Sequence, residues 1–229
     1  MKILALDAAT EACSVALLID QELKVRSLDS GKSNAGQLVR MTEELLAEGG
    51  ISLSHLDAIA SSIGPGAFTG VRITVAVAQG LAFGADLRVA PVTTLEALAM
   101  HAPLERNHIA LACLDARMGE LYWGLFRQDP SAGVAAVAPS QVGAPQSIAL
   151  EAGRAYVGVG RGFLAYPDLA LSLGIAVPPA LAGALPNARE IALLGALRLA
   201  AGQGVDPADL TPLYLRDKVA FTEAERAGR

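Results

Sequence analysis

One glycine-rich stretch stands out in this chain: Ser62-Ile63-Gly64-Pro65-Gly66-Ala67-Phe68-Thr69-Gly70-Val71-Arg72. It joins a short apolar strand pattern, residues 57–63, to a long apolar helix pattern, residues 71–83. Glycines and a proline between two such elements predict a tight loop that opens onto a helix N-terminus. The unpaired N–H groups and the positive end of the helix dipole favour an anion there.

The loop matches neither of the common phosphate motifs. No Lys-Ser or Lys-Thr follows the last glycine, and Gly70 comes one residue too late for a dinucleotide fingerprint. The residues therefore leave two interpretations open. One is an ordinary strand-to-helix turn, and the other is a phosphate cradle formed by Gly64, Gly66 and Thr69.

The elements around this loop predict an α/β fold. Three strand patterns, at 2–7, 13–20 and 22–28, are joined too closely for crossover helices, so neighbouring strands must be antiparallel. An amphipathic helix with Leu38, Met41 and Leu45 on one side follows, then the strand and helix around the loop. A strand at 87–92 and a helix at 94–100 complete the order β-β-β-α-β-α-β-α, which predicts a mixed sheet covered by helices.

The second half of the chain predicts a shorter lobe. Its expected strands are 109–114, 121–127, 146–151, 156–159 and 163–166, and a helix at 188–201 should return to the first lobe. We therefore divide the chain into a first lobe (1–104, completed by the helix near 188–202), a second lobe (105–187) and a C-terminal segment (203–229).

Composition narrows the class of protein. The net charge of −5 and the absence of a Lys/Arg run argue against a broad nucleic-acid surface, so any action on RNA should pass through a partner. The apolar helix pattern, at about 13 residues, is shorter than the roughly 20 that cross a bilayer, and we expect neither a membrane span nor a signal peptide. The two cysteines should be reduced core thiols, and the expected location is cytoplasmic.

Few residues offer chemistry. Asp7 ends the first strand, where a carboxylate could address a metal–phosphate group or form a turn. Asp115 could mirror Asp7 in the second half or pair with Arg117. The three histidines lack metal-binding spacing, and no nucleophile motif is present, so the sequence predicts no metal site and no catalytic residue.

The helix pattern at 71–83 is apolar on every face. A helix lying on one side of a sheet should show polar residues outward, so this one must be covered on both sides. The cover could come from the monomer itself or from another chain.

Four segments in order resemble the TsaB (YeaZ) family. They are GPGAFTGVR with Gln79-Gly80-Leu81-Ala82, the opening stretch 3–16, the stretch 114–123 from Leu114-Asp115-Ala116-Arg117, and Pro212-Leu213-Tyr214-Leu215-Arg216. The resemblance implies the two-lobed actin-like ATPase (ribonuclease H-like) fold.

It also implies a non-catalytic subunit needed for threonylcarbamoylation of the adenosine next to the anticodon in tRNA. Such a subunit stabilises the catalytic subunit TsaD, joins the ATPase TsaE, forms a homodimer in isolation and meets tRNA only through the complex. ATP or ADP is expected at most at the contact with TsaD. The helix pair implied as the interface carries Leu38, Met41, Leu45, Val71, Val75, Ala78 and Ala82. The alternative is an ATP-dependent small-molecule kinase or a protease-like hydrolase of the same fold.

Overall fold

The first lobe is built on a five-stranded mixed sheet. β1 (Lys2–Asp7), β2 (Ala12–Ile19) and β3 (Glu22–Asp29) form an antiparallel ribbon. β1 also pairs in parallel with β4 (Ala58–Ser62), and β4 with β5 (Arg88–Val92), so the order is β3-β2-β1-β4-β5. The computed structural model describes residues 1–29, 35–103 and 108–216. Within that part of the chain, the strands predicted for the first lobe are confirmed.

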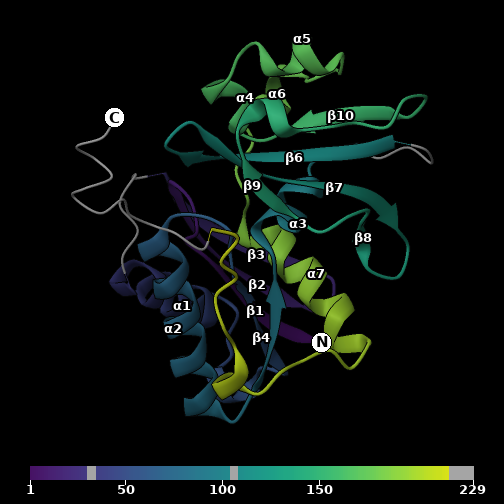
Figure 1. The fold of residues 1–229 in the computed structure, drawn as a ribbon. Helices are drawn as coiled ribbons and strands as arrows, with labels where there is room; N and C mark the ends of the chain where they lie inside the picture. Colours follow the sequence, from purple (N-terminus) through teal and green to yellow (C-terminus); the bar gives the residue numbers. More distant parts are fainter. Residues whose placement is uncertain (30–34, 104–107, 217–229) are drawn as a thin grey trace, which may run out of the picture.

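Helices cover both faces of this sheet (Figure 1). α1 (Ala35–Glu48) and α2 (Phe68–Ala85) lie on one face, and α7 (Ala188–Ala200) lies on the other. Side chains alternate along a strand, so Leu4 and Leu6 of β1 face α1 and α2, while Ile3 and Ala5 face α7. The predicted return of the helix at 188–201 to the first lobe is therefore confirmed.

α2 is longer than the sequence predicts. It spans 18 residues and begins at Phe68, directly after the glycine loop, instead of at residue 71. By length and composition alone α2 could cross a membrane, but only a third of its residues are buried, and these pack on the sheet. The helix ends where Asp86 adopts a left-handed backbone conformation with φ 54°.

The second lobe carries another five-stranded sheet. Its order is β10-β6-β7-β8, and β9 pairs with another part of β7. The strands are β6 (His108–Arg117), β7 (Glu120–Asp129), β8 (Gly133–Ala136), β9 (Gln141–Gly143) and β10 (Ala155–Val159). The short helices α4 (Gly162–Ala165), α5 (Leu169–Leu173) and α6 (Pro179–Ala182) lie beyond β10, and α3 (Thr94–Ala99) packs between the lobes.

Two predicted strands of the second lobe are wrong. Residues 146–151 contain a 3-10 turn (Pro145–Ser147) followed by irregular chain, and residues 163–166 form most of α4. Gly160, at φ 109°, turns the chain out of β10, and Phe163 then packs in the apolar cluster with Cys113 and Leu121. The sequence analysis also missed the short strands β8 and β9.

The last described residues, 205–216, cross from the first lobe to the second, and we call them the C-terminal strap. Val205 pairs with Val89, and the Leu213 amide donates to the Ile63 carbonyl at 2.7 Å. Arg216 at the end of the strap pairs with Glu120 of the second lobe. The strap therefore borders the junction between the two lobes.

Candidate functional site

The glycine loop packs against the chain that follows β1. An ideal Cβ on Gly66 would lie 2.1 Å from the Ala9 carbonyl oxygen, and one on Gly70 would lie 2.0 Å from the Ala8 carbonyl oxygen. The Ala67 amide donates to the Ala9 carbonyl at 2.7 Å. These glycines therefore allow backbone to approach backbone, which leaves no room for a phosphate between them.

Asp7 lies beneath this contact and has no exposed surface. Its Oδ1 accepts from the Ala9 amide at 3.2 Å, whereas its Oδ2 has no hydrogen bond of good geometry with the described residues. Burial raises the pKa of Asp7 to about 6, partly offset by the nearby Ser62 hydroxyl and the Ala9 amide. A carboxylate placed in this way does not reach a metal–phosphate group in the cleft.

The four residues predicted to bind phosphate are therefore not brought together. Gly64 is buried, has φ 97°, and its carbonyl accepts from the Thr94 amide at 2.8 Å. Thr69 lies exposed on the first turn of α2, whereas Asp7 is enclosed. The described geometry fits the interpretation of a strand-to-helix turn.

The seven residues predicted to form the partner interface are core residues, which is a correction. Each is at most 4 % exposed, and all pack with the first sheet or close to it: Leu38, Met41, Leu45, Val71, Val75, Ala78 and Ala82. Six of them pack in the core against the first sheet, where a partner could reach them only by displacing it, and Val71 lines the cavity between the lobes. These seven residues form the inner face of α1 and α2, toward the first sheet and the lobe junction.

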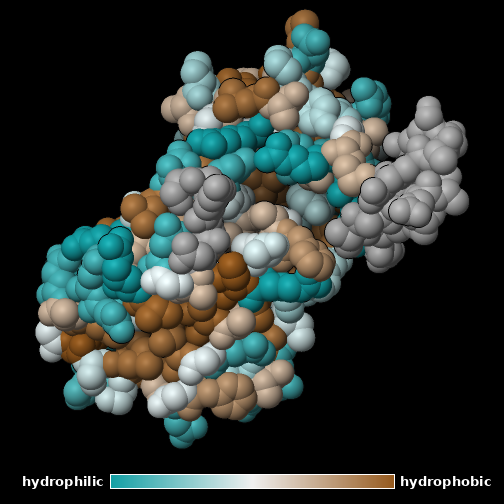
Figure 2. All heavy atoms as spheres, turned by 90° about the vertical axis from the view of Figure 1, so that its left-hand side faces the viewer, coloured by the Kyte–Doolittle hydropathy of each residue, from teal (hydrophilic) through white to brown (hydrophobic). Residues whose placement is uncertain are grey.

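The outer face of α2 is also largely apolar, and the described chain leaves most of it uncovered, with Tyr214 lying against its N-terminal end. Exposed residues follow one another at helical spacing along this face: Phe68, Arg72, Ala76, Gly80, Phe83 and Gly84. We call them the outer stripe. Ile73, Val77 and Leu81 are half-buried beside it, and Val39 of α1 is exposed nearby on the same side of the lobe. Figure 2 shows the resulting apolar area on the side of the molecule that carries α1 and α2.

A pattern of small residues in the sequence indicates the outer stripe. Ala76, Gly80 and Gly84 recur every four residues, and a Cβ added at either glycine would meet nothing within 4 Å. Small residues on an open helix face let another helix approach closely. The all-round apolar pattern indicated such a second face, but it could not tell which face the sheet covers.

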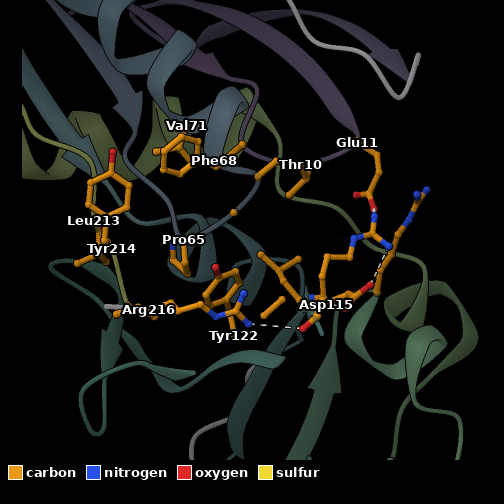
Figure 3. Close-up of a pocket in the computed structure, with 18 of the residues that line it drawn as sticks. Thr10, Glu11, Pro65, Phe68, Val71, Asp115, Tyr122, Leu213, Tyr214 and Arg216 are labelled. Atoms are coloured by element: carbon orange, nitrogen blue, oxygen red, sulfur yellow. Dashed lines mark hydrogen bonds and ion pairs between the residues drawn. The ribbon is translucent and has the colours of Figure 1, made fainter. Parts of the chain in front are cut away.

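A cavity of about 420 Å³ lies at the junction of the lobes (Figure 3). It is lined by the loops after β1 and β4, by the tip of the β6–β7 hairpin and by the C-terminal strap. Arg117 at that tip pairs with Asp115 at 3.0 Å and with Glu11 across the cavity at 3.7 Å. The Asp115 carboxylate also accepts from the Arg117 amide at 2.7 Å, so its role in the turn is confirmed.

The charges that line the cavity are already compensated. Arg161 lies 3.6 Å from Asp29, and Arg216 pairs with Glu120. Among the described residues, no three His, Cys, Asp or Glu side chains gather as metal ligands. The arginines at the rim of the cavity are thus held in ion pairs with carboxylates of this chain.

Comparisons with known proteins agree with this geometry. A family model described as "TsaD: tRNA N6-adenosine threonylcarbamoyltransferase" matches residues 30–223. The "tRNA threonylcarbamoyladenosine biosynthesis protein TsaB" of Escherichia coli K12 is 35% identical over 225 residues, which cover 96% of this chain and 97% of that protein. The protein of the same name from Haemophilus influenzae is 34% identical over 234 residues, 96% of each chain.

Solved structures extend the likeness to the whole fold. YeaZ from Pseudomonas aeruginosa superposes with a TM-score of 0.83 at 35% identity, covering 93% of this chain and 99% of that one. A second Pseudomonas aeruginosa structure, described as an uncharacterized protein with similarity to peptidase YEAZ, gives a TM-score of 0.84 at 36% identity, covering 94% and 99%. The predicted actin-like α/β fold is confirmed, and the chain belongs to the TsaB (YeaZ) family.

Proposed function

We propose that this chain is a non-catalytic subunit of the machinery that makes threonylcarbamoyladenosine in tRNA, and that it binds the transferase TsaD through the outer stripe of α2. The uncovered apolar face of α2 carries this proposal. Exposed apolar surface of this kind is characteristic of a protein–protein contact. The names of its relatives point to the pathway.

The fold of the expected partner supports the contact. The model of the transferase family also matches this chain, so TsaD should present a comparable pair of helices. Two such pairs can pack face to face, and the small residues Ala76, Gly80 and Gly84 would let their backbones approach closely. In isolation a second copy of this chain takes the same place.

The remaining partners follow from the same proposed role as a subunit that binds TsaD. TsaE binds the pair, tRNA meets the complex through TsaD, and the complex works in the cytoplasm. ATP or ADP, where it takes part, is held at the contact with TsaD. The close backbone packing of Gly66 and Gly70 and the burial of Asp7 support this placement.

A pair of substitutions tests the docking face. Phe83 is 63% exposed on the outer stripe, and Leu171 is 84% exposed on α5 of the second lobe. Co-purification with TsaD should be lost for Phe83→Glu and kept for the matched control Leu171→Glu. Retention of TsaD by both variants would place the contact elsewhere.

Turnover by the isolated chain tests the enzymatic alternative. A kinase or hydrolase needs an accessible phosphate site or an assembled catalytic group. The burial of Asp7 and the lack of a cluster of three metal-ligating side chains among the described residues support the accessory role instead. We expect no ATP hydrolysis and no transfer to tRNA by this chain alone, and transfer once TsaD and TsaE are added. Robust activity of the lone chain would favour the enzyme over the accessory subunit.

A further inference from the structure

Arg72 differs from every other arginine in the described part of the chain. The others all lie within 4.0 Å of a carboxylate: Arg26, Arg40, Arg88, Arg117, Arg127, Arg154, Arg161, Arg189, Arg198 and Arg216. Arg72 has no ion pair or hydrogen bond with any described residue. Its guanidinium lies 3.2 Å from the centroid of the Phe68 ring and 5.1 Å from that of Tyr214.

The two rings hold this guanidinium in place. Their centroids are 6.3 Å apart, and both rings are about half exposed. Stacking on a ring occupies a face of the planar guanidinium and leaves its N–H edges available for a bidentate acceptor. Arg72 is therefore a pre-positioned cation whose donors point to no acceptor in the described chain.

Arg72 also continues the apolar contact surface. It precedes Ala76 and Gly80 at intervals of four residues and follows Phe68 at the same interval, so it lies near the end of the outer stripe closest to the glycine loop. A helix lying along that stripe would pass over the small residues and reach the guanidinium at its end. Desolvation in that contact would favour an acceptor that also carries a negative charge.

We propose that Arg72 receives a carboxylate side chain from the TsaD helix that docks on the outer stripe. This inference rests on the proposed function and identifies the chemistry by which that partner is recognised. A single carboxylate fits better than a nucleic-acid backbone, because a row of phosphates needs several free cations. The neighbouring arginines of the cavity, Arg117, Arg161 and Arg216, are already paired.

Binding measurements with TsaD test the contact. Arg72→Ala should weaken the affinity by about tenfold and Arg72→Glu by more, because the second change brings two negative charges together. Arg72→Lys, which keeps the charge but loses the planar fork, should fall between wild type and Arg72→Ala. The matched control is Arg154→Ala in the second lobe, which should bind TsaD as wild type does. Circular dichroism confirms that each variant is folded.

An exchange of charges identifies the acceptor. Each Asp and Glu on the docking helices of TsaD is changed to Arg in turn, and one of these variants should restore binding to Arg72→Glu. Failure of every exchange would overturn the carboxylate contact, as would unchanged TsaD affinity of Arg72→Ala together with weaker retention of tRNA by the complex. Loss of binding in Phe83→Glu with normal binding in Arg72→Ala would overturn this inference alone. Normal binding in Phe83→Glu would overturn the proposed function.

Discussion

The carbonyl oxygen of Ala9 stands 2.1 Å from the position that a Cβ on Gly66 would occupy. The oxygen is a backbone atom and the position of a Cβ is fixed by the backbone, so no side-chain rotation can relieve the overlap. The contact fixes the glycine loop on the chain after β1 and thereby sets where α2 begins. The glycine loop, which resembles a ligand-binding loop in the sequence, thus serves in the fold to pack the start of α2 against the chain after β1.

Gly66→Ala should destabilise the protein by about 1–3 kcal/mol, because the loop or the chain after β1 must move to admit one methyl group. Urea denaturation measures this loss. Gly84→Ala is the control, since a Cβ there meets nothing within 4 Å. Gly84 lies in the last turn of α2, where that change should stabilise by less than the roughly 1 kcal/mol expected in a helix interior. Equal effects of the two changes would contradict a structural role for the contact between Gly66 and Ala9.

Asp7→Asn should change how stability depends on pH. The pKa of Asp7 is raised from 3.8 to about 6 by burial, so the folded protein holds this proton more tightly than the unfolded chain does. The contribution of Asp7 to the free energy of unfolding is therefore largest below about pH 4, falls as the pH rises towards and through 6, and does not change at higher pH. Asn carries no charge and escapes this loss, so Asp7→Asn should be more stable by about 1–3 kcal/mol at neutral pH.

Chemical denaturation from about pH 4 to pH 8 checks this prediction. The control is Asp168→Asn, which makes the same chemical change at an exposed position at the start of α5. A profile of Asp7→Asn that runs parallel to that of the wild type would show that Asp7 does not titrate in this range.

The first lobe could be predicted from the sequence because its signals are local and strong. The short connections between β1, β2 and β3, the helical spacing of Leu38, Met41 and Leu45 in α1 and the apolar run of β4 can each be recognised within a few residues of sequence. The second lobe contains shorter elements whose state depends on distant contacts. Phe163 looks like a strand residue, yet Gly162 and Phe163 form α4 because they pack around Cys113 of β6.

The candidate site was predictable only in part. The periodicity of α2 shows two apolar faces. Val75 and Ala76 are both apolar, and only the packing on the sheet shows that Val75 is buried while Ala76 is exposed. The stacking of Arg72 on Tyr214 joins residues far apart in the chain, which no local pattern encodes. For the same reason, the backbone contact of Gly66 with Ala9 could not be told from a ligand loop.

Arg198→Ala should show that α7 is tied to the first lobe by a specific polar contact. Arg198 lies 2.5 Å from Glu96 of α3 and donates to the Pro91 carbonyl at β5, and both charged side chains are mostly buried. Its removal leaves Glu96 partly unpaired, which should cost about 1–3 kcal/mol of stability. Thermal unfolding compares it with Arg40→Ala, whose exposed partner Glu44 should contribute no more than about 0.5 kcal/mol. An equal loss of stability in the two variants would show that the contact of Arg198 with Glu96 and Pro91 stabilises the protein no more than an exposed ion pair does.

Ala76 and Ala78 of α2 provide the sharpest comparison, because they are two residues apart and face opposite ways. Ala78 has no exposed surface and packs in the core between α2 and the first sheet, whereas Ala76 is exposed on the outer stripe. Ala78→Glu would place an unpaired charge in the core at a cost of several kcal/mol, enough to unfold a protein of ordinary stability. Ala76→Glu would place the same side chain in water while the protein is alone.

We therefore expect Ala78→Glu to lose its folded circular dichroism spectrum and Ala76→Glu to keep it. Analytical ultracentrifugation and TsaD binding should then show that folded Ala76→Glu neither self-associates nor joins TsaD, because a docking helix would bury its charge without a partner. A folded Ala78→Glu would mean that this helix face is not core. Full association of Ala76→Glu would show that the outer stripe stays exposed in the complex, and both results can be read from the same two preparations.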